Sequence, residues 1–333
     1  MNDPLLDIQH LQVNFYTPEG IARAVAGVSF SIPLGETVGL VGESGCGKSI
    51  TALATLGLIP SPPGRIEGGQ AIFEGRDLLK LNPDSLRRLR GSDISMIFQE
   101  PMTSLNPVMP IGWQVAEPLW IHGNMTRSAA LARAADYLDQ VMIPAARKRM
   151  NDFPHQLSGG MRQRVMIAMA MICGPKLLIA DEPTTALDVT IQAQILNLMM
   201  KIKKQSRMSL LLITHDLGVI AQTADRVVVM YAGQVVEKAG VVDLFDRPFH
   251  PYTKGLIKSM PRLGGRVGRQ SLYEIPGTVP PLTEKITGCS FADRCPYVFD
   301  PCRRQPPDLE KLGEGRYARC WLHRFSQKGP ENG

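Results

Sequence analysis

Residues 42–49 combine glycines with a lysine and a hydroxyl, which is the composition of a phosphate-binding loop. They read Gly-Glu-Ser-Gly-Cys-Gly-Lys-Ser and fit the pattern GxxxxGK[ST]. Glycines let consecutive backbone N–H groups converge on phosphate oxygens, while Lys48 would reach the β- and γ-phosphates and Ser49 would bind Mg²⁺. The sequence therefore predicts a site for a nucleoside triphosphate and Mg²⁺. We expect its phosphate-contacting residues to be Gly42, Glu43, Ser44, Gly45, Cys46, Gly47, Lys48, Ser49 and Ile50.

Two carboxylates follow a second apolar run. Residues 177–182 read Leu-Leu-Ile-Ala-Asp-Glu, which predicts a buried strand that ends in acids. Asp181 fits the residue that holds Mg²⁺, and Glu182 is placed to polarise the attacking water. Taken alone, two acids at a strand end could equally be solvated surface groups. Together with the phosphate loop they favour a hydrolytic site.

Residues 157–161, Leu-Ser-Gly-Gly-Met, directly precede a predicted helix. Small residues expose backbone N–H groups at a helix N-terminus, which is a ready site for an anion. A simple serine cap followed by flexible glycines would look the same. The pentapeptide by itself leaves both interpretations open.

An α/β architecture must position these groups. The phosphate loop lies between a predicted strand and a predicted helix, and the acids end another strand. Predicted strands are 11–15, 28–32, 36–41, 177–180, 210–214, 226–231 and 234–237, with a turn at 232–233. The stretch 85–175 is predicted to be helical, most clearly at 128–141 and 161–173; further helices are expected at 50–58 and 191–202. From about residue 241 prolines interrupt the pattern, which indicates a loop-rich extension.

Charge and composition exclude several classes of protein. Hydrophobic residues make up 44% and charged residues 20%, which is a globular composition. The chain lacks a run of eighteen apolar residues, so we expect no membrane span, and its first residues do not predict a signal peptide. Of the net charge of +6, residues 241–333 carry 15 basic and 10 acidic side chains. That balance is weaker than the basic stripe of a DNA-binding protein, so no nucleic-acid partner is expected.

The order and spacing of the motifs resemble the ATP-binding cassette (ABC) family of transporter ATPases. The resemblance rests on 42–49, Gln99, 157–161, 181–182, 186–188 and His215, and it covers residues 5–240. It implies a P-loop NTPase ABC nucleotide-binding domain: a RecA-like α/β core with an antiparallel β subdomain and a helical subdomain at about 100–170. The expected domains are a cassette at 1–240 and an extension at 241–333.

The resemblance also implies roles for single residues. Gln99 resembles the glutamine that contacts Mg²⁺ and the attacking water, His215 the histidine that contacts the γ-phosphate, and Asp188 the aspartate that links two sites. Phe15 resembles the aromatic residue that stacks on adenine, with Tyr16 as the alternative. The signature that closes on the partner's ATP would be Leu157, Ser158, Gly159, Gly160 and Met161. Two departures are Met161, where Gln is usual, and Ile50, where a second hydroxyl is common; neither removes Lys48, Ser49 or Glu182.

Finer matches resemble the importers of oligopeptides, dipeptides and nickel, most closely their D-type ATPase subunits. They lie at 98–107, 250–253, 275–280, 288–289 and 294–296. This implies a second, related ATPase subunit in a heterodimer, two permease subunits and an external substrate-binding protein, with the chain peripheral at the cytoplasmic face of the bacterial inner membrane. Nickel or antimicrobial peptides are alternative substrates. A soluble ABC ATPase acting on ribosomes or DNA, and a subunit that binds ATP without turnover, are alternative functions.

Four of the six cysteines gather in the extension, at Cys289, Cys295, Cys302 and Cys320. Paired CxxC knuckles, which zinc ribbons favour, are absent, and disulfides are disfavoured on a cytosolic face. Four thiolates can hold a [4Fe–4S] cluster, and the resemblance supports that choice; zinc is the alternative, and free structural thiols the third. Nothing in the sequence connects these cysteines to the phosphate loop, so a structural or redox-sensing role is expected.

Overall fold

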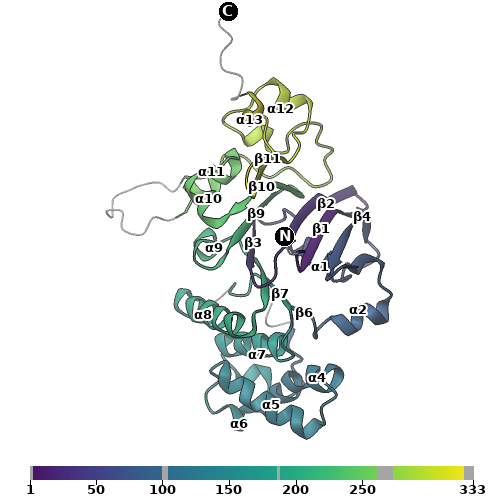
Figure 1. Ribbon diagram of the computed structural model, residues 1–333, viewed down its shortest axis with the longest axis vertical. Coiled ribbons are helices and arrows are strands. Elements are labelled where there is room, and N and C mark those ends of the chain that lie inside the picture. Colours follow the sequence, from purple (N-terminus) through teal and green to yellow (C-terminus); the bar gives the residue numbers. More distant parts are fainter. Residues whose placement is uncertain (1–2, 100–103, 186–187, 261–272, 326–333) are drawn as a thin grey trace, which may run out of the picture. The chain divides into compact units, whose positions relative to one another are not determined.

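The computed structural model describes residues 3–99, 104–185, 188–260 and 273–325, and Figure 1 labels most of its helices and strands. The chain divides into two compact units. The first comprises Met1–Leu5, Ile32–Thr37 and Lys80–Ile213, and the second comprises Leu6–Ser31, Val38–Leu79 and Thr214–Gly333. Each unit is assembled from segments that are distant in the sequence.

A four-stranded sheet forms the N-terminal part of the second unit. Its strands, in the order β2-β1-β4-β5, are β2 (Gly20–Ile32), β1 (Leu6–Thr17), β4 (Gly64–Phe73) and β5 (Arg76–Asp77). Strand β1 buries Leu6, Ile8, Leu11 and Val13, and it pairs antiparallel with β4. The burial switches register near Gln9–Gln12, where the pairing is irregular. Strand β4 was not expected from the sequence.

A run of five hydrogen-bonded strands carries the phosphate loop and the extension in the same unit. In the order β11-β12-β10-β9-β3 these are β11 (Glu310–Gly313), β12 (Arg316–Ala318), β10 (Gln234–Gly240), β9 (Arg226–Tyr231) and β3 (Thr37–Val41). Strand β3 is buried throughout and runs parallel to β9. Strands β9 and β10 form a hairpin whose turn residues, Ala232 and Gly233, have φ values of 43° and 76°. Such positive φ values match the turn of a two-residue hairpin.

Short helices complete the second unit. They are α1 (Lys48–Thr55), η1 (Leu78–Lys80), α9 (Leu217–Thr223), α10 (Val241–Asp246), α11 (Pro251–Lys258), η3 (Ala292–Arg294), α12 (Asp300–Arg304) and α13 (Leu322–Phe325). None of the helices in the described residues of either unit has the length and apolar composition needed to cross a bilayer.

The first unit joins a parallel sheet to a group of helices. Strands β6 (Ile94–Ile97), β7 (Leu177–Asp181) and β8 (Ser209–Ile213) pair in parallel, with Asp181 opposite Ile213. Their buried apolar residues fit a sheet that is covered on both faces. The helices are α2 (Pro83–Leu89), α4 (Ile111–His122), α5 (Arg127–Gln140), α6 (Ala146–Arg149), η2 (Pro154–Gln156), α7 (Gly159–Met171) and α8 (Val189–Ser206).

Most elements predicted from periodicity are present within one to three residues of the expected bounds. The prediction that 85–175 is helical throughout was wrong, because β6 lies inside it. Its four residues, Ile-Ser-Met-Ile, are too short to show a strand period. The extension is also more ordered than expected, since β12 pairs with β10 and β11 pairs with β12, which continues the run of strands.

A buried polar chain connects the extension to β10. The carboxylate of Glu237 is fully buried and accepts hydrogen bonds from the backbone N–H groups of Phe249 and His250, at 2.7 and 2.8 Å. His250 in turn caps α11, because its Nδ1 accepts from the N–H of Tyr252 at 3.1 Å. Burial lowers the pKa of His250 to about 3, and the charges of the neighbouring His323, Arg319 and Lys254 act in the same direction, whereas a hydrogen bond with the Arg319 backbone opposes the shift. The imidazole is therefore neutral in the folded protein.

This neutral histidine predicts a loss of stability in mild acid. Below pH 6.5 the unfolded chain gains a proton at His250 that the folded chain does not, so stability falls with decreasing pH by up to about 1.4 kcal/mol per pH unit. The loss continues until pH approaches the folded value near 3. Burial raises the pKa of Glu237, so the folded chain takes up a proton at this carboxylate at a higher pH than the unfolded chain does. Protonation of Glu237 therefore adds stability as the pH falls towards the ordinary value of a glutamate, which opposes the effect of His250 there.

The contribution of His250 is isolated by His250→Asn, which keeps an acceptor at the cap but does not titrate. Urea unfolding at pH 7.5 and pH 5.5 should show a smaller drop in unfolding free energy for the variant than for the parent chain. Equal drops would mean that His250 does not carry the effect.

Candidate functional site

The phosphate loop, residues 42–49, joins β3 to α1 in a conformation that requires glycine. Gly42 and Gly47 have φ values of 153° and 98°, which side-chain-bearing residues rarely adopt. A Cβ on Gly42 would also collide with the carbonyl of Met230 and lie 2.7 Å from the Cys46 sulfur, and one on Gly47 would collide with the carbonyl of Ala24. The backbone is thus packed closely on one side. The middle of the loop, Ser44 and Gly45, is exposed.

Lys48 begins α1 and folds back over the loop. Its ammonium group donates to the carbonyl oxygens of Gly42 and Glu43 at 2.8 and 2.9 Å, and only 6% of the residue is exposed. The turn at Gly233 also holds the loop, because its N–H donates to the Cys46 carbonyl at 3.1 Å. The cation is therefore held at the loop before any phosphate arrives.

Glu43 connects the loop to the extension, a contact that the sequence did not reveal. Its N–H donates to the Tyr252 hydroxyl oxygen at 2.9 Å. Its carboxylate accepts from Arg294 at 2.8 and 3.1 Å. The sequence led to the expectation that nothing connects the cysteines at 289–320 to the phosphate loop. This expectation was wrong, because Arg294, which bonds Glu43 of the loop, directly precedes Cys295.

Cys46 is unsuited to react with thiol reagents. The residue is fully buried, and burial raises the pKa of its thiol despite the nearby Lys48 ammonium. A thiol reacts as its thiolate, so a raised pKa lowers its reactivity.

In the first unit, Gln99 and Glu182 meet although 83 residues separate them. The Gln99 amide donates to Glu182 Oε2 at 3.3 Å, and the Thr185 hydroxyl donates to the same oxygen at 2.9 Å. Glu182 follows β7 with a φ of 46°, and its N–H donates to the Ile213 carbonyl. A non-glycine residue in this strained conformation is a common feature of functional sites. Asp181, the last residue of β7, is 3% exposed.

The pentapeptide 157–161 ends η2 and starts α7. Ser158 is the N-cap, and its hydroxyl accepts from the Met161 N–H at 3.4 Å. Gln163, buried in the next turn, donates its amide to the Pro183 carbonyl, one residue beyond Glu182. This link was missed, since a lone glutamine two residues after the motif gives no signal of its own.

The remaining predicted residues lie at element ends. Asp188 caps α8 by accepting from the Ile191 N–H at 2.9 Å. His215 is exposed in the second unit, just before α9. Phe15 is half-buried opposite Gly64 on β4, whereas the exposed Tyr16 donates its hydroxyl to Glu67 at 2.7 Å. Residues 100–103 and 186–187, which belong to two of the matched motifs, lie outside the described residues.

The four cysteines of the extension are free thiols. Burial, together with a smaller contribution from neighbouring thiols, raises the pKa of Cys289 to about 11 and that of Cys320 to about 12. The donor chemistry fits an iron–sulfur cluster or zinc. Across the described part of the chain, however, no three Cys, His, Asp or Glu side chains are arranged to hold a metal ion.

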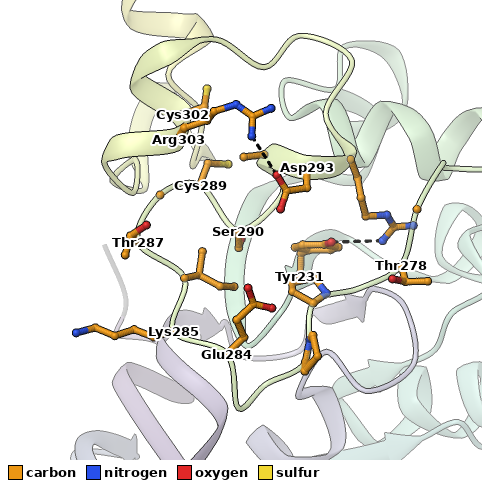
Figure 2. A pocket seen from close by; sticks show the side chains of 17 residues that line it. Tyr231, Thr278, Glu284, Lys285, Thr287, Cys289, Ser290, Asp293, Cys302 and Arg303 are labelled. Atoms are coloured by element: carbon orange, nitrogen blue, oxygen red, sulfur yellow. Dashed lines mark hydrogen bonds and ion pairs between the residues drawn. The ribbon is translucent and has the colours of Figure 1, made fainter.

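A cavity of about 470 Å³ opens beside two of these thiols. Figure 2 shows Cys289 and Cys302 on one side of it and Tyr231 on another, with the ion pair of Arg303 and Asp293 between them. Arg294 also lines this space. Cys289, Cys302 and Arg294 therefore border one cavity.

A strand, a glycine-rich loop and a helix that begins with lysine define a P-loop nucleotide-binding protein. The family model described as "ABC transporter" matches residues 25–185, and the model described as "Oligopeptide/dipeptide transporter, C-terminal region" matches residues 236–302. The chain belongs to the ABC transporter ATPases, and its fold is that of the ABC nucleotide-binding domain. The α/β fold and the ATPase class expected from the sequence are thereby confirmed.

Similar proteins extend over nearly the whole chain. A probable peptide ABC transporter ATP-binding protein of Sinorhizobium fredii is 53% identical, covering 96% of this chain and 95% of that protein. The oligopeptide transport ATP-binding protein OppD is 51% identical in Bacillus subtilis, covering 96% and 88%, and 50% identical in Escherichia coli, covering 96% and 93%. Among solved structures, the ATP-binding cassette MJ0796 bound to ADP and Pi has a TM-score of 0.64 at 27% identity, covering 71% of this chain and 98% of that one.

Proposed function

We propose that this chain is the ATP-hydrolysing subunit of an importer that powers peptide uptake across the cytoplasmic membrane. The observation that carries the proposal is identity of 50–53% with peptide and oligopeptide transport ATP-binding proteins over at least 95% of the chain. The match of residues 236–302 to the oligopeptide/dipeptide transporter C-terminal region supports the peptide class.

Each site residue receives the role that its motif implies. Backbone N–H groups of residues 42–49 bind the phosphates, and the positive φ values of Gly42 and Gly47 set the course of the loop that presents them. Lys48 transfers its hydrogen bonds from loop carbonyls to phosphate, and Ser49 supplies a hydroxyl to Mg²⁺. Bound Mg²⁺ would neutralise charge on the phosphates.

The acids and their partners carry hydrolysis in this proposal. Asp181 binds Mg²⁺, and Glu182 accepts a proton from the attacking water while Gln99 and His215 orient water and γ-phosphate. The contact of Gln99 with Glu182 supports their joint role. We assign adenine stacking to the half-buried Phe15, with the exposed Tyr16 as the alternative. Residues 157–161 act on ATP held by the opposite subunit, and Asp188 links the two sites.

Coupling to transport needs partners that this chain does not contain. We assign a second, related ATPase subunit, two permease subunits that receive the helical region through Gln99, and an external substrate-binding protein. The chain is then peripheral at the cytoplasmic face of the bacterial inner membrane. ATP drives closure only because it binds the closed pair more tightly than the open pair.

Co-purification and reconstitution test the proposal. Tagged chain should co-purify permease subunits, and the assembled transporter should hydrolyse ATP and take up peptide. Co-sedimentation with ribosomes and no permease would support the non-transport alternative. ATP binding without any hydrolysis in the assembled complex would support a regulatory subunit. Uptake of nickel or antimicrobial peptides but not of ordinary peptides would change the proposed substrate and leave the transport ATPase role unchanged.

We further propose that Cys289, Cys295, Cys302 and Cys320 bind a [4Fe–4S] cluster, with zinc as the alternative. Support comes from four free thiols within one stretch of the extension, where neighbouring thiols contribute to the raised pKa values of Cys289, Cys295 and Cys320. Binding would draw them together, since the present arrangement is not a ready metal site.

Metal analysis of protein purified without oxygen tests the cluster. We expect about four irons and four sulfides per chain, with a broad absorption band at roughly 400 nm. Cys295→Ser should lose the iron, whereas Cys173→Ser, a half-buried cysteine outside the segment, should keep it. Zinc in place of iron would select the alternative, and absence of both metals would make this a segment of structural thiols.

A further inference from the structure

Arg294 of the extension holds a side chain of the phosphate loop. Its two terminal nitrogens donate to the two carboxylate oxygens of Glu43 at 2.8 and 3.1 Å, across 251 residues of sequence. This two-pronged geometry is the strong form of an arginine–carboxylate contact. Arg294 is 8% exposed and the side chain of Glu43 is 27% exposed, so the guanidinium group is shielded from water while the carboxylate is partly open to it.

The guanidinium group is fixed on its other sides as well. Its Nε donates to the Pro276 carbonyl at 2.9 Å, and one terminal nitrogen also lies 3.4 Å from the Tyr231 hydroxyl oxygen, the bond drawn in Figure 2. It lies over the rings of Tyr231 and Phe291 at 5.7 and 6.0 Å. Removing one member of such a pair leaves the other charge without compensation.

Glu43 is thereby held at all three of its polar groups. Tyr252 accepts from its N–H, Lys48 donates to its carbonyl, and Arg294 donates to its carboxylate. The residue that supports the phosphate-binding lysine is thus positioned from the extension. Without Arg294, a free carboxylate would stand in the loop that must receive a triphosphate.

The backbone of Arg294 belongs to the cysteine segment. The turn η3 (Ala292–Arg294) lies between two cysteines, since the Ala292 N–H donates to the Cys289 carbonyl at 3.0 Å and the Cys295 N–H donates to the Ala292 carbonyl at 3.3 Å. The Cys289 N–H also donates to the Cys302 carbonyl at 2.8 Å. A change at these cysteines therefore moves the backbone that carries Arg294.

We propose that Arg294 is a positioning residue for the phosphate loop, and that the cysteine segment 289–302 sets the affinity of the loop for ATP through the contact of Arg294 with Glu43. The inference rests on the proposed function, because it assumes that the loop binds ATP. Arg294 acts by compensating the charge of Glu43 and by holding its side chain, while Tyr252 and Lys48 hold its backbone. Neither action touches the attacking water, so affinity changes and the chemical step does not.

The test measures nucleotide affinity and turnover separately. A fluorescent ATP analogue with Mg²⁺ gives Kd for the full chain, and the assembled transporter gives KM and kcat. Arg294→Met should raise Kd and KM about tenfold with kcat within about twofold of the parent. Arg294→Lys keeps the positive charge but loses the planar guanidinium that bonds both carboxylate oxygens, so its Kd should lie between those of the parent and of Arg294→Met. The matched control is Arg303→Met, which removes an exposed arginine directly after the cysteine segment that pairs with Asp293 inside it.

A double-mutant cycle separates positioning from general damage to the extension. If Arg294 acts through Glu43, then Arg294→Met made in a Glu43→Gln background should change Kd by less than about twofold. The inference is overturned if Arg294→Met binds ATP like the parent, or if it costs the same tenfold in the Glu43→Gln background. A parent chain that binds no ATP contradicts the proposed function instead, so the two failures are distinguishable.

Discussion

Glu182→Gln should bind ATP with an affinity within about twofold of the parent and hydrolyse it about a thousandfold more slowly. The amide keeps the size of the side chain and can still accept from Thr185, but it cannot take a proton from water. General-base catalysis is worth about 10²–10⁴ in rate, which sets the size of the loss. Single-turnover hydrolysis in the assembled transporter, together with a binding isotherm for the full chain, measures both quantities.

Asp84→Asn is the matched control for this variant. Asp84 is an exposed carboxylate of the same unit that pairs with Arg87 on α2, outside the helical region assigned to the permease, so both rate and affinity should be unchanged. A Glu182→Gln protein that kept more than about a tenth of the parent kcat would show that another group accepts the proton. Weak binding together with slow turnover would indicate a structural role for the contacts to Gln99 and Thr185.

The phosphate loop could be predicted because its requirements are local. Gly42, Gly47 and Lys48 all lie within seven residues of one another. The positive φ values and the close packing at Gly42 and Gly47 exclude nearly every residue other than glycine. The apolar run of β3 before the loop and the helix after it are equally local signals. The same holds for β7, whose five buried residues end at Asp181.

Contacts between distant segments could not be predicted in this way. Arg294 and Glu43 lie 251 residues apart, and neither residue type nor spacing singles them out. Gln163 reaches the Pro183 carbonyl through the packing of α7, which periodicity does not describe. Strand β6 was missed because its four residues are recognisable only by their pairing with β7.

The two departures from the family pattern have a physical explanation. Met161 contributes its backbone N–H to the cap of α7 by donating to Ser158, and any residue supplies that group. Ile50 follows the lysine and serine of the loop in the first turn of α1, where its backbone continues the helix. Both positions therefore tolerate a change of side chain without loss of the loop or the cap.

Lys48→Met should lower ATP affinity about a hundredfold. A charge-assisted hydrogen bond contributes about 1.5–3 kcal/mol, and in the proposed function Lys48 would offer such bonds to more than one phosphate oxygen. The methionine keeps the apolar stem in its buried place but leaves the Gly42 and Glu43 carbonyls without the ammonium donor, so a modest loss of stability accompanies the loss of binding. Titration with a fluorescent ATP analogue measures affinity, and urea unfolding of the same preparation measures stability.

The control for Lys48→Met is Lys311→Met, which removes an exposed lysine of β11 and the same unit charge. If bulk charge attracted ATP, both variants would lose affinity equally. If Lys48 acts at the phosphates, only Lys48→Met should lose affinity. Added salt should then leave the difference in affinity between the two variants in place, because a bond made within the loop is screened far less than a surface charge. Parent-like affinity in Lys48→Met would remove the lysine from the site and leave phosphate binding to the backbone N–H groups of the loop.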